Sequence, residues 1–246
     1  MELIVQRPNK QIFRREGPQG AQLIKLFGEG VPASSVLSEA TNFSRAYEAG
    51  LPVPRLHEVT KLDGKWAIIA DFIEGETLLR HMEAEPGNPR WMELFVRLQM
   101  GVHEQYIPKA QRLQDKLERK IAASGLDATT RYELQTRLDA MDHHKNSCHG
   151  DFIPSNIILQ EGRAFILDWN QLTQGNAAAD AANTYITMEK YGYPDLAAAY
   201  LKLYCERSDT ARQYVMKWAP IVAGAALGDC PEQDRAFYRK WCEGLV

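Results

Sequence analysis

The chain lacks the features that would point to a membrane or to an oxidising compartment. Its 246 residues contain no apolar run long enough to span a bilayer. The N-terminal segment Met1–Arg7 lacks the basic start and the long apolar stretch of a signal peptide. The four cysteines are scattered and include no Cys-x-x-Cys pair. We therefore expect reduced thiols in a cytoplasmic protein, with neither a disulfide framework nor a zinc site.

A strong excess of charge is also absent. The formal net charge is -3, so electrostatics provide no reason to expect nucleic acid or an anionic membrane as a partner. Charged residues make up 25% of the chain and apolar residues 45%, which are ordinary values for a globular protein. The length is sufficient for one domain of two lobes or for two small domains.

The first part of the chain has the pattern of short strands around one helix. Five segments with β-rich composition are bounded by turn residues: Glu2–Gln6, Gln11–Arg15, Ala21–Phe27, Leu56–Thr60 and Lys65–Phe72. The first three predict an antiparallel meander. An amphipathic helix follows, capped by Ser34 or Ser35 and ending at Gly50, because Pro52 and Pro54 prevent its continuation. This order predicts a compact α+β lobe.

After Gly75 the pattern becomes mainly helical. Four helices are expected before the central motif, at Thr77–Met82, Trp91–Gln105, Ala110–Ala123 and Thr129–Asp142. Short strands surround that motif, and further helices run from Ala177 to the end of the chain. We predict an α+β, two-lobed fold, in which residues 1–74 form the nucleotide-binding lobe and residues 75–246 form the catalytic and acceptor-binding lobe.

The most informative segment is Ser147–Leu159. It contains His149 and Asp151, then Asn156, and a second apolar run after it ends at Asp168. Phosphoryl transfer from ATP needs this order of groups. A lone Asp or Asn in a loop is more often a turn or cap residue, but the coincidence of all three favours chemistry. We predict that Asp151 orients or deprotonates an acceptor hydroxyl and that Asn156 and Asp168 bind magnesium.

Lys25 lies between apolar neighbours in the third predicted strand. Alternation along the strand allows it to face a cleft and to contact phosphate oxygens, although position alone favours a solvent-facing lysine. Glu39, on the first helix, is available as an ion-pair partner that holds the lysine in place. Other carboxylates, such as Glu48, are also within the same helix.

Together these residues resemble the aminoglycoside phosphotransferase family, which is grouped with choline kinases and other small-molecule kinases of the protein-kinase-like fold. The matching segments, in chain order, are Lys25, Glu39, Ile73–Leu78, His149–Asp151, Asn156 and Ile166–Trp169. The resemblance covers nearly the whole chain. It implies ATP and Mg²⁺ as cofactors, a small-molecule hydroxyl substrate, and adenine binding by backbone groups of Asp71 and Ile73. It also implies that Asp180 braces the catalytic loop.

The chain departs from the kinase pattern at several positions. No Gly-x-Gly-x-x-Gly is present, and the turn Arg7–Lys10, which is expected to cover the phosphates, contains no glycine. Either the backbone approaches the triphosphate less closely there or Lys10 contributes to binding. Trp169 and Asn170 replace the Phe-Gly of protein kinases, and no Ala-Pro-Glu follows. A protein substrate is therefore not expected.

The acceptor remains open between an aminoglycoside-like polycation and a choline-like quaternary ammonium compound. Acidic and aromatic residues are both available near the expected acceptor site: Tyr185, Glu189, Tyr191, Tyr193, Trp218 and Asp229. One alternative function is a catalytically weak nucleotide-binding protein, suggested by the missing glycine loop. Another is a metal-dependent hydrolase that uses His149, Asp151 and Asp168, but it needs further metal ligands and does not explain Lys25.

Overall fold

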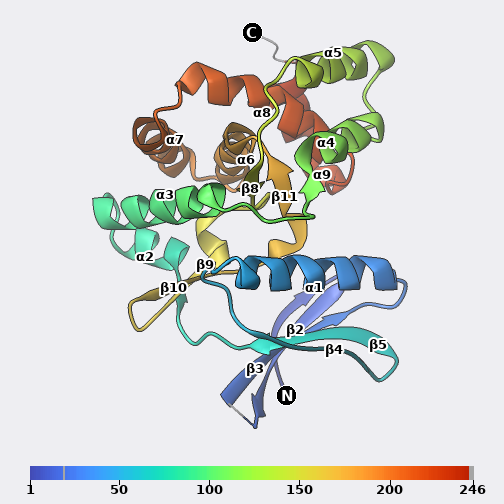
Figure 1. Ribbon diagram of the computed structural model, residues 1–246, viewed down its shortest axis with the longest axis vertical. Coiled ribbons are helices and arrows are strands. Elements are labelled where there is room, and N and C mark those ends of the chain that lie inside the picture. The colour runs from blue at the N-terminus through green and yellow to red at the C-terminus, as the bar shows by residue number, and fades with distance from the viewer. Residues whose placement is uncertain (19, 244–246) are drawn as a thin grey trace. The chain divides into compact units, whose positions relative to one another are not determined.

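The computed structural model describes residues 1–18 and 20–243 (Figure 1). Gln19, and the last three residues of the predicted C-terminal lobe, lie outside the described residues. The chain forms two compact units, and both are discontinuous in sequence. Unit 1 comprises Met1–Ala84 and Pro154–Gln171, and unit 2 comprises Glu85–Ile153 and the chain from Leu172 onward. The assignment of nucleotide binding to residues 1–74 and of catalysis to residues 75–246 stays a prediction.

Unit 1 is built on an antiparallel sheet of five strands with the order β1-β2-β3-β5-β4. The strands are β1 (Glu2–Arg7), β2 (Lys10–Gly17), β3 (Gly20–Phe27), β4 (Leu56–Leu62) and β5 (Lys65–Asp71). The predicted meander is therefore confirmed for β1 to β3. Because side chains alternate across a strand, neighbouring residues of β3 face opposite sides of the sheet.

Helix α1 (Ala33–Glu48) packs against one face of this sheet (Figure 1). Phe27 and Ile68 from the sheet form a buried cluster with Val36 and Ala40 of the helix. The helix starts after Pro32, whose side chain makes no capping hydrogen bond. The predicted serine cap is therefore wrong: proline, with its fixed φ, begins the helix, and both serines lie in the first turn.

The second segment of unit 1 adds a small sheet with the order β10-β9-β6. Its strands are β6 (Glu76–Thr77), β9 (Ile157–Gln160) and β10 (Arg163–Ile166). Helix α2 (Leu78–Ala84) and the single turn η1 (Pro154–Asn156) contact this sheet, and the single turn η2 (Trp169–Gln171) contacts α1. The amide of Ile166 donates to the carbonyl of Pro52 at 2.7 Å, and the Asn42 side chain on α1 donates to the Asn170 carbonyl at 3.4 Å. These bonds connect the segment that carries Asp168 to α1 and to the loop that follows α1.

Unit 2 is mainly helical. Its helices are α3 (Pro89–Glu104), α4 (Leu113–Ala122), α5 (Ala128–Asp139), α6 (Ala177–Lys190), α7 (Pro194–Ser208), α8 (Arg212–Ala226) and α9 (Glu232–Glu243). Helix α6 packs against α7 and α8. A short sheet has the order β7-β11-β8, formed by β7 (Gln111–Arg112), β8 (Asn146–Cys148) and β11 (Thr173–Gly175). Helix α4 starts three residues later than predicted because β7 pairs with β11.

The predicted α+β class is confirmed, with an antiparallel N-terminal sheet and a largely helical remainder. No helix among the described residues has both the length and the apolar character required to cross a membrane. The four cysteines are free, and Cys148 at the end of β8 is buried.

Gly75 provides a test of the packing in unit 1. A Cβ added there would overlap the carbonyl oxygen of Leu159 in β9. Since that oxygen belongs to the backbone, it cannot rotate away, and we expect Gly75→Ala to lower the free energy of unfolding by about 1–3 kcal/mol. In denaturant titrations, Gly101→Ala is the matched control, because nothing lies within 4 Å of a Cβ at that position in α3. The free energy of unfolding of the control should rise by about 1 kcal/mol, because alanine favours a helix more than glycine does. Equal effects of the two changes would contradict this packing.

Candidate active site

Lys25 and Glu39 form a buried ion pair between β3 and α1. Each residue is only 8% exposed, and the Lys25 ammonium donates to Oε1 of Glu39. Lys25 shares the α1 face of the sheet with Phe27, two residues further along the strand, which is the alternation predicted from the sequence. The solvent-facing alternative for Lys25 is therefore wrong.

Asp168 meets two ammonium groups. Its Oδ1 lies 3.5 Å from Nζ of Lys25, and its Oδ2 lies 3.4 Å from Nζ of Lys10. Burial opposes the charge on Lys25, but the carboxylates of Asp168 and Glu39 outweigh it and raise the pKa of Lys25. Burial and the adjacent Lys25 lower the pKa of Lys10, and Asp168 offsets this only in part. Asp168 has a φ of +59°, a left-handed conformation that is uncommon outside glycine and that turns the chain directly after β10.

These groups line a pocket of about 410 Å³ within unit 1. One part of the wall is apolar and includes Leu23, Ile68 and Ala70 from the sheet, with Ile158 and Leu167 from the second segment. The other part carries the charged residues Lys10, Lys25, Glu39 and Asp168. The pocket therefore joins a surface suited to a flat apolar ring with a surface suited to an anion.

Asp71 and Ile73, the predicted hinge residues, also line this pocket. The side chain of Asp71 is bound elsewhere in the unit: Oδ1 lies 2.6 Å from Nε2 of His57, and Oδ2 accepts from the amide of Arg55 at 3.1 Å. These contacts hold the end of β5 against β4.

Asn156, at the end of η1, completes the same wall. Its carbonyl accepts from the amide of Leu167 at 2.8 Å, which sets the residue next to the strand end that carries Asp168. Amide and carboxylate oxygens are the ligands that Mg²⁺ prefers, so the donor set fits that ion. The described residues contain no cluster of three or more His, Cys, Asp or Glu suited to a metal. A group of that kind is what the hydrolase hypothesis required.

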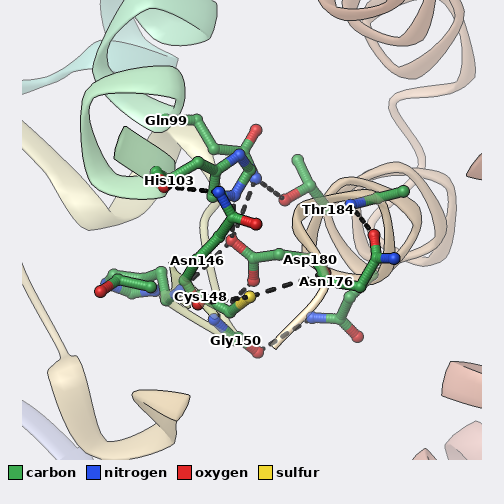
Figure 2. Close-up of polar contacts among 12 residues, drawn as sticks. Gln99, His103, Asn146, Cys148, Gly150, Asn176, Asp180 and Thr184 are labelled. Atoms are coloured by element: carbon green, nitrogen blue, oxygen red, sulfur yellow. Dashed lines mark hydrogen bonds and ion pairs between the residues drawn. The ribbon is translucent and has the colours of Figure 1, made fainter. Parts of the chain in front are cut away.

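Asp151 belongs to unit 2, where Asp180 braces the loop that carries it (Figure 2). Asp180 lies on α6 and is 2% exposed. Its Oδ1 accepts from the amide of Gly150 at 2.7 Å, and its Oδ2 accepts from the amide of His149 at 3.2 Å. Gly150 has a φ of +82°, a conformation that glycine adopts without strain. The carboxylate thus holds two consecutive backbone amides just before Asp151.

The imidazole of His149 is fully buried and supports the same loop. Its Nδ1 accepts from the amide of Asp151 at 3.2 Å, and its ring packs edge-on against Phe152 at a centroid distance of 5.7 Å. The side chain of Asn183 on α6 donates to the carbonyl of Gly150 at 2.9 Å. His149 therefore acts on the backbone of the loop.

The sequence prediction missed the residues that compensate the buried charge of Asp180. Nε2 of His103 lies 2.9 Å from Oδ2, and Nε2 of Gln99 donates to the same oxygen at 3.3 Å. Burial opposes the charge, but the His103 hydrogen bond and the Gly150 amide hold the pKa of Asp180 below its usual value. Gln99 and His103 are four residues apart on α3, so they lie on one helix face. Two polar residues at this spacing on an otherwise apolar helix face were the sequence signal that could have indicated partners for a buried polar group.

The candidate acceptor residues differ in accessibility within unit 2. Trp218 is 1% exposed and belongs to the core, whereas Tyr191 is 56% exposed. The hydroxyl of Tyr185 donates to Glu189 at 2.9 Å. Lys190 lies 4.3 Å from the centre of the Tyr191 ring. Of the predicted aromatic set, Trp218 thus contributes packing and not an accessible surface.

Comparisons with known proteins give one family match. The model of the phosphotransferase enzyme family (APH) matches residues 7–218, which contain every predicted site residue. No curated protein sequence matches the chain.

Solved structures of similar fold include a thermostable mutant of aminoglycoside phosphotransferase APH(4)-Ia, in a ternary complex with AMP-PNP and hygromycin B. That match has a TM-score of 0.73 at 14% identity and covers 98% of this chain and 91% of the other. A type VIII aminoglycoside-3'-phosphotransferase matches with a TM-score of 0.64 at 19% identity, covering 100% and 93%. An ethanolamine kinase of Plasmodium vivax matches with a TM-score of 0.69 at 12% identity, covering 99% and 81%. These likenesses confirm the kinase-like fold.

Asp180 provides a test of the loop support. Asp180→Asn should lower the free energy of unfolding by about 3 kcal/mol near neutral pH, because it removes one partner of a buried hydrogen-bonded charge. The folded-state pKa of Asp180 is depressed. Its contribution is therefore complete above the unfolded-state pKa of about 3.9 and disappears as the pH falls through the lower folded-state value.

The measurement is denaturant unfolding of both proteins at several pH values from neutral to acidic. Asp139→Asn, at the exposed end of α5, is the control and should change stability little. If the free energies of unfolding of wild type and Asp180→Asn differed by the same amount down to strongly acidic pH, the assignment of a depressed pKa to Asp180 would be contradicted.

Proposed function

Because the chain belongs to the phosphotransferase enzyme family, we propose that it is an ATP- and Mg²⁺-dependent kinase that phosphorylates a hydroxyl group of a small molecule. The predicted family and the predicted enzyme class, a small-molecule phosphotransferase, are confirmed at the level of that family. The observation that carries the finer proposal is the shared pocket. Lys25, Glu39, Asn156 and Asp168 line the same cavity as the hinge residues.

The apolar half of the pocket suits adenine. Leu23 and Ala70 from the large sheet and Ile158 from the small sheet provide side chains for a flat ring. Backbone groups of Asp71 and Ile73 are the proposed hydrogen-bonding partners of the ring. Residues 1–74 are accordingly proposed as the nucleotide-binding lobe.

The charged half suits a triphosphate. Lys25 is the proposed phosphate ligand, and Glu39 holds its ammonium in place through the buried pair. The raised pKa of Lys25 keeps it charged at neutral pH, as phosphate binding requires. Asn156 and Asp168 would hold Mg²⁺, which when bound neutralises charge on the triphosphate and on the transferred group.

Asp151 is the proposed catalytic residue at the acceptor hydroxyl. The acceptor oxygen forms a bond to the γ-phosphorus, the bond from that phosphorus to the bridging oxygen breaks, and ADP leaves. Asp151 orients the hydroxyl or accepts its proton. The loop is held by Asp180, and four residues of chain separate Asp151 from Asn156. Residues 75–246 are proposed as the catalytic and acceptor-binding lobe.

The proposed acceptor is aminoglycoside-like or choline-like. Acidic and aromatic side chains occur together near the end of α6, where Glu189 and the exposed Tyr191 are found. Such a combination suits a cationic ligand. A catalytically weak nucleotide-binding protein is the less favoured alternative, because the polar groups that transfer requires are present.

The first test separates chemistry from nucleotide binding. Asp151→Ala should reduce phosphoryl transfer by several powers of ten while ATP binding stays close to wild type, because Asp151 contacts the acceptor and not the nucleotide. Asp168→Ala should instead weaken Mg²⁺-dependent ATP binding. Transfer is measured as ADP release and ATP binding by calorimetry.

Asp139→Ala, an exposed aspartate on α5, is the matched control for both variants. It should retain wild-type transfer and binding. Full turnover by Asp151→Ala would falsify the proposed catalytic role.

The acceptor is found with a screen. Wild type and Asp151→Ala are incubated with MgATP and aminoglycosides, choline, ethanolamine, thiamine, homoserine or sugars, and ADP release is recorded. We expect at least one acceptor to stimulate ADP release by wild type only. If no acceptor does so although ATP binds, the non-catalytic alternative gains support. If ATP does not bind, the kinase proposal is wrong.

A further inference from the structure

The turn between β1 and β2 differs from a glycine-rich phosphate loop. It consists of Pro8 and Asn9 between the paired residues Arg7 and Lys10. Pro8 has no backbone N–H to donate, and neither turn residue is a glycine that would allow the backbone to approach a phosphate closely. The carbonyl of Asn9 accepts from the amide of Gly28 at 2.9 Å, which ties the turn to the end of β3.

Lys10 stands at the pocket end of this turn. It is the first residue of β2, and its backbone pairs with Arg7 on one side and with Phe27 on the other. Its side chain is 23% exposed and lines the charged half of the pocket together with Lys25. The backbone of Lys10 is thus held on both sides while its flexible stem extends toward the pocket.

The contacts of the Lys10 ammonium are loose. It lies 3.4 Å from Asp168 Oδ2, and Lys25 lies 3.5 Å from the other oxygen of the same carboxylate. Strong charge-assisted N–H···O bonds are about 2.7–2.9 Å long. Lys25 has Glu39 as a second anionic partner. Asp168 is therefore shared by two cations, and a more highly charged anion in the pocket would compete well for Lys10.

We propose that Lys10 is a second phosphate-binding residue, whose ammonium moves from Asp168 to a β- or γ-phosphate oxygen when the nucleotide binds. The side chain thereby supplies the contact that backbone N–H groups supply in a glycine-rich loop. This release also leaves the Asp168 carboxylate available as a ligand for the metal. The inference rests on the proposed function, because it assumes that this pocket binds a nucleotide.

The test is the affinity for adenosine, AMP, ADP and ATP, measured by calorimetry in EDTA and again with Mg²⁺. Lys10→Met removes the charge and keeps an apolar stem of similar length. We expect its affinity for ATP, or for both ATP and ADP, to fall by about 10- to 100-fold, which is the usual effect of losing a charge-assisted hydrogen bond. Its affinity for adenosine should equal that of wild type. A loss confined to ATP identifies the γ-phosphate, and a loss shared with ADP identifies the β-phosphate.

Three further proteins make the result specific. Lys10→Arg keeps the positive charge and should retain most of the ATP affinity. Lys10→Gln removes the charge with a polar side chain and should behave like Lys10→Met, which separates charge from packing. Lys65→Met is the matched control, because Lys65 lies on β5 outside the pocket wall and pairs with Glu29. It should bind all four ligands like wild type.

The outcomes distinguish this inference from the proposed function. If wild type binds ATP and transfers phosphate but Lys10→Met and Lys10→Gln keep its ATP affinity, Lys10 is only a structural partner of Asp168. An equal loss of adenosine and ATP affinity would also overturn the inference, since it would indicate a damaged pocket. A wild-type protein that binds no adenine nucleotide overturns both proposals.

Discussion

A buried ammonium needs a carboxylate, and the geometry of the pocket in unit 1 depends on that requirement. Lys25 and Glu39 are each 8% exposed, so neither charge is stable there without the other. Their pairing joins α1 to β3, and Asp168 joins the same group from a segment much later in the chain. The charged half of the pocket is therefore a consequence of how one buried lysine is compensated.

Unit 2 contains the opposite charge in its interior: a buried carboxylate that needs hydrogen-bond donors. Asp180 accepts two backbone amides from the loop, and His103 and Gln99 supply further donors. A fully satisfied polar network of this kind is rigid, because each displaced group would lose a hydrogen bond without gaining water. The position of the Asp151 backbone is thus determined by a helix that begins 26 residues later in the sequence.

Particular elements show where local pattern was informative. The meander β1–β3 followed from the strand pattern. Alternation allowed Lys25 to face inward, but only the structure showed that it is buried and that Glu39 is its partner. The cap of α1 did not follow from the local pattern, because Ser34 or Ser35 was interpreted as the cap, whereas the fixed φ of Pro32 already starts the helix at Ala33. Strand β7 was missed as well. Its two residues have no strand pattern of their own and pair with β11 only after the chain has returned.

The family was predicted from His149, Asp151, Asn156 and Asp168 together with Lys25, Glu39 and the segment Ile73–Leu78, because their order along the chain resembles that of the aminoglycoside phosphotransferases. The compensation of charge was decided only in three dimensions. Lys10 meets Asp168 across 158 residues, and His103 meets Asp180 across 77. Such contacts depend on which distant segments of the chain pack together, and neither the spacing of residues nor the composition predicts that. The types and order of the site residues were therefore visible in the sequence. Their ion pairs, their pKa shifts and their positions relative to one another depend on the folded chain.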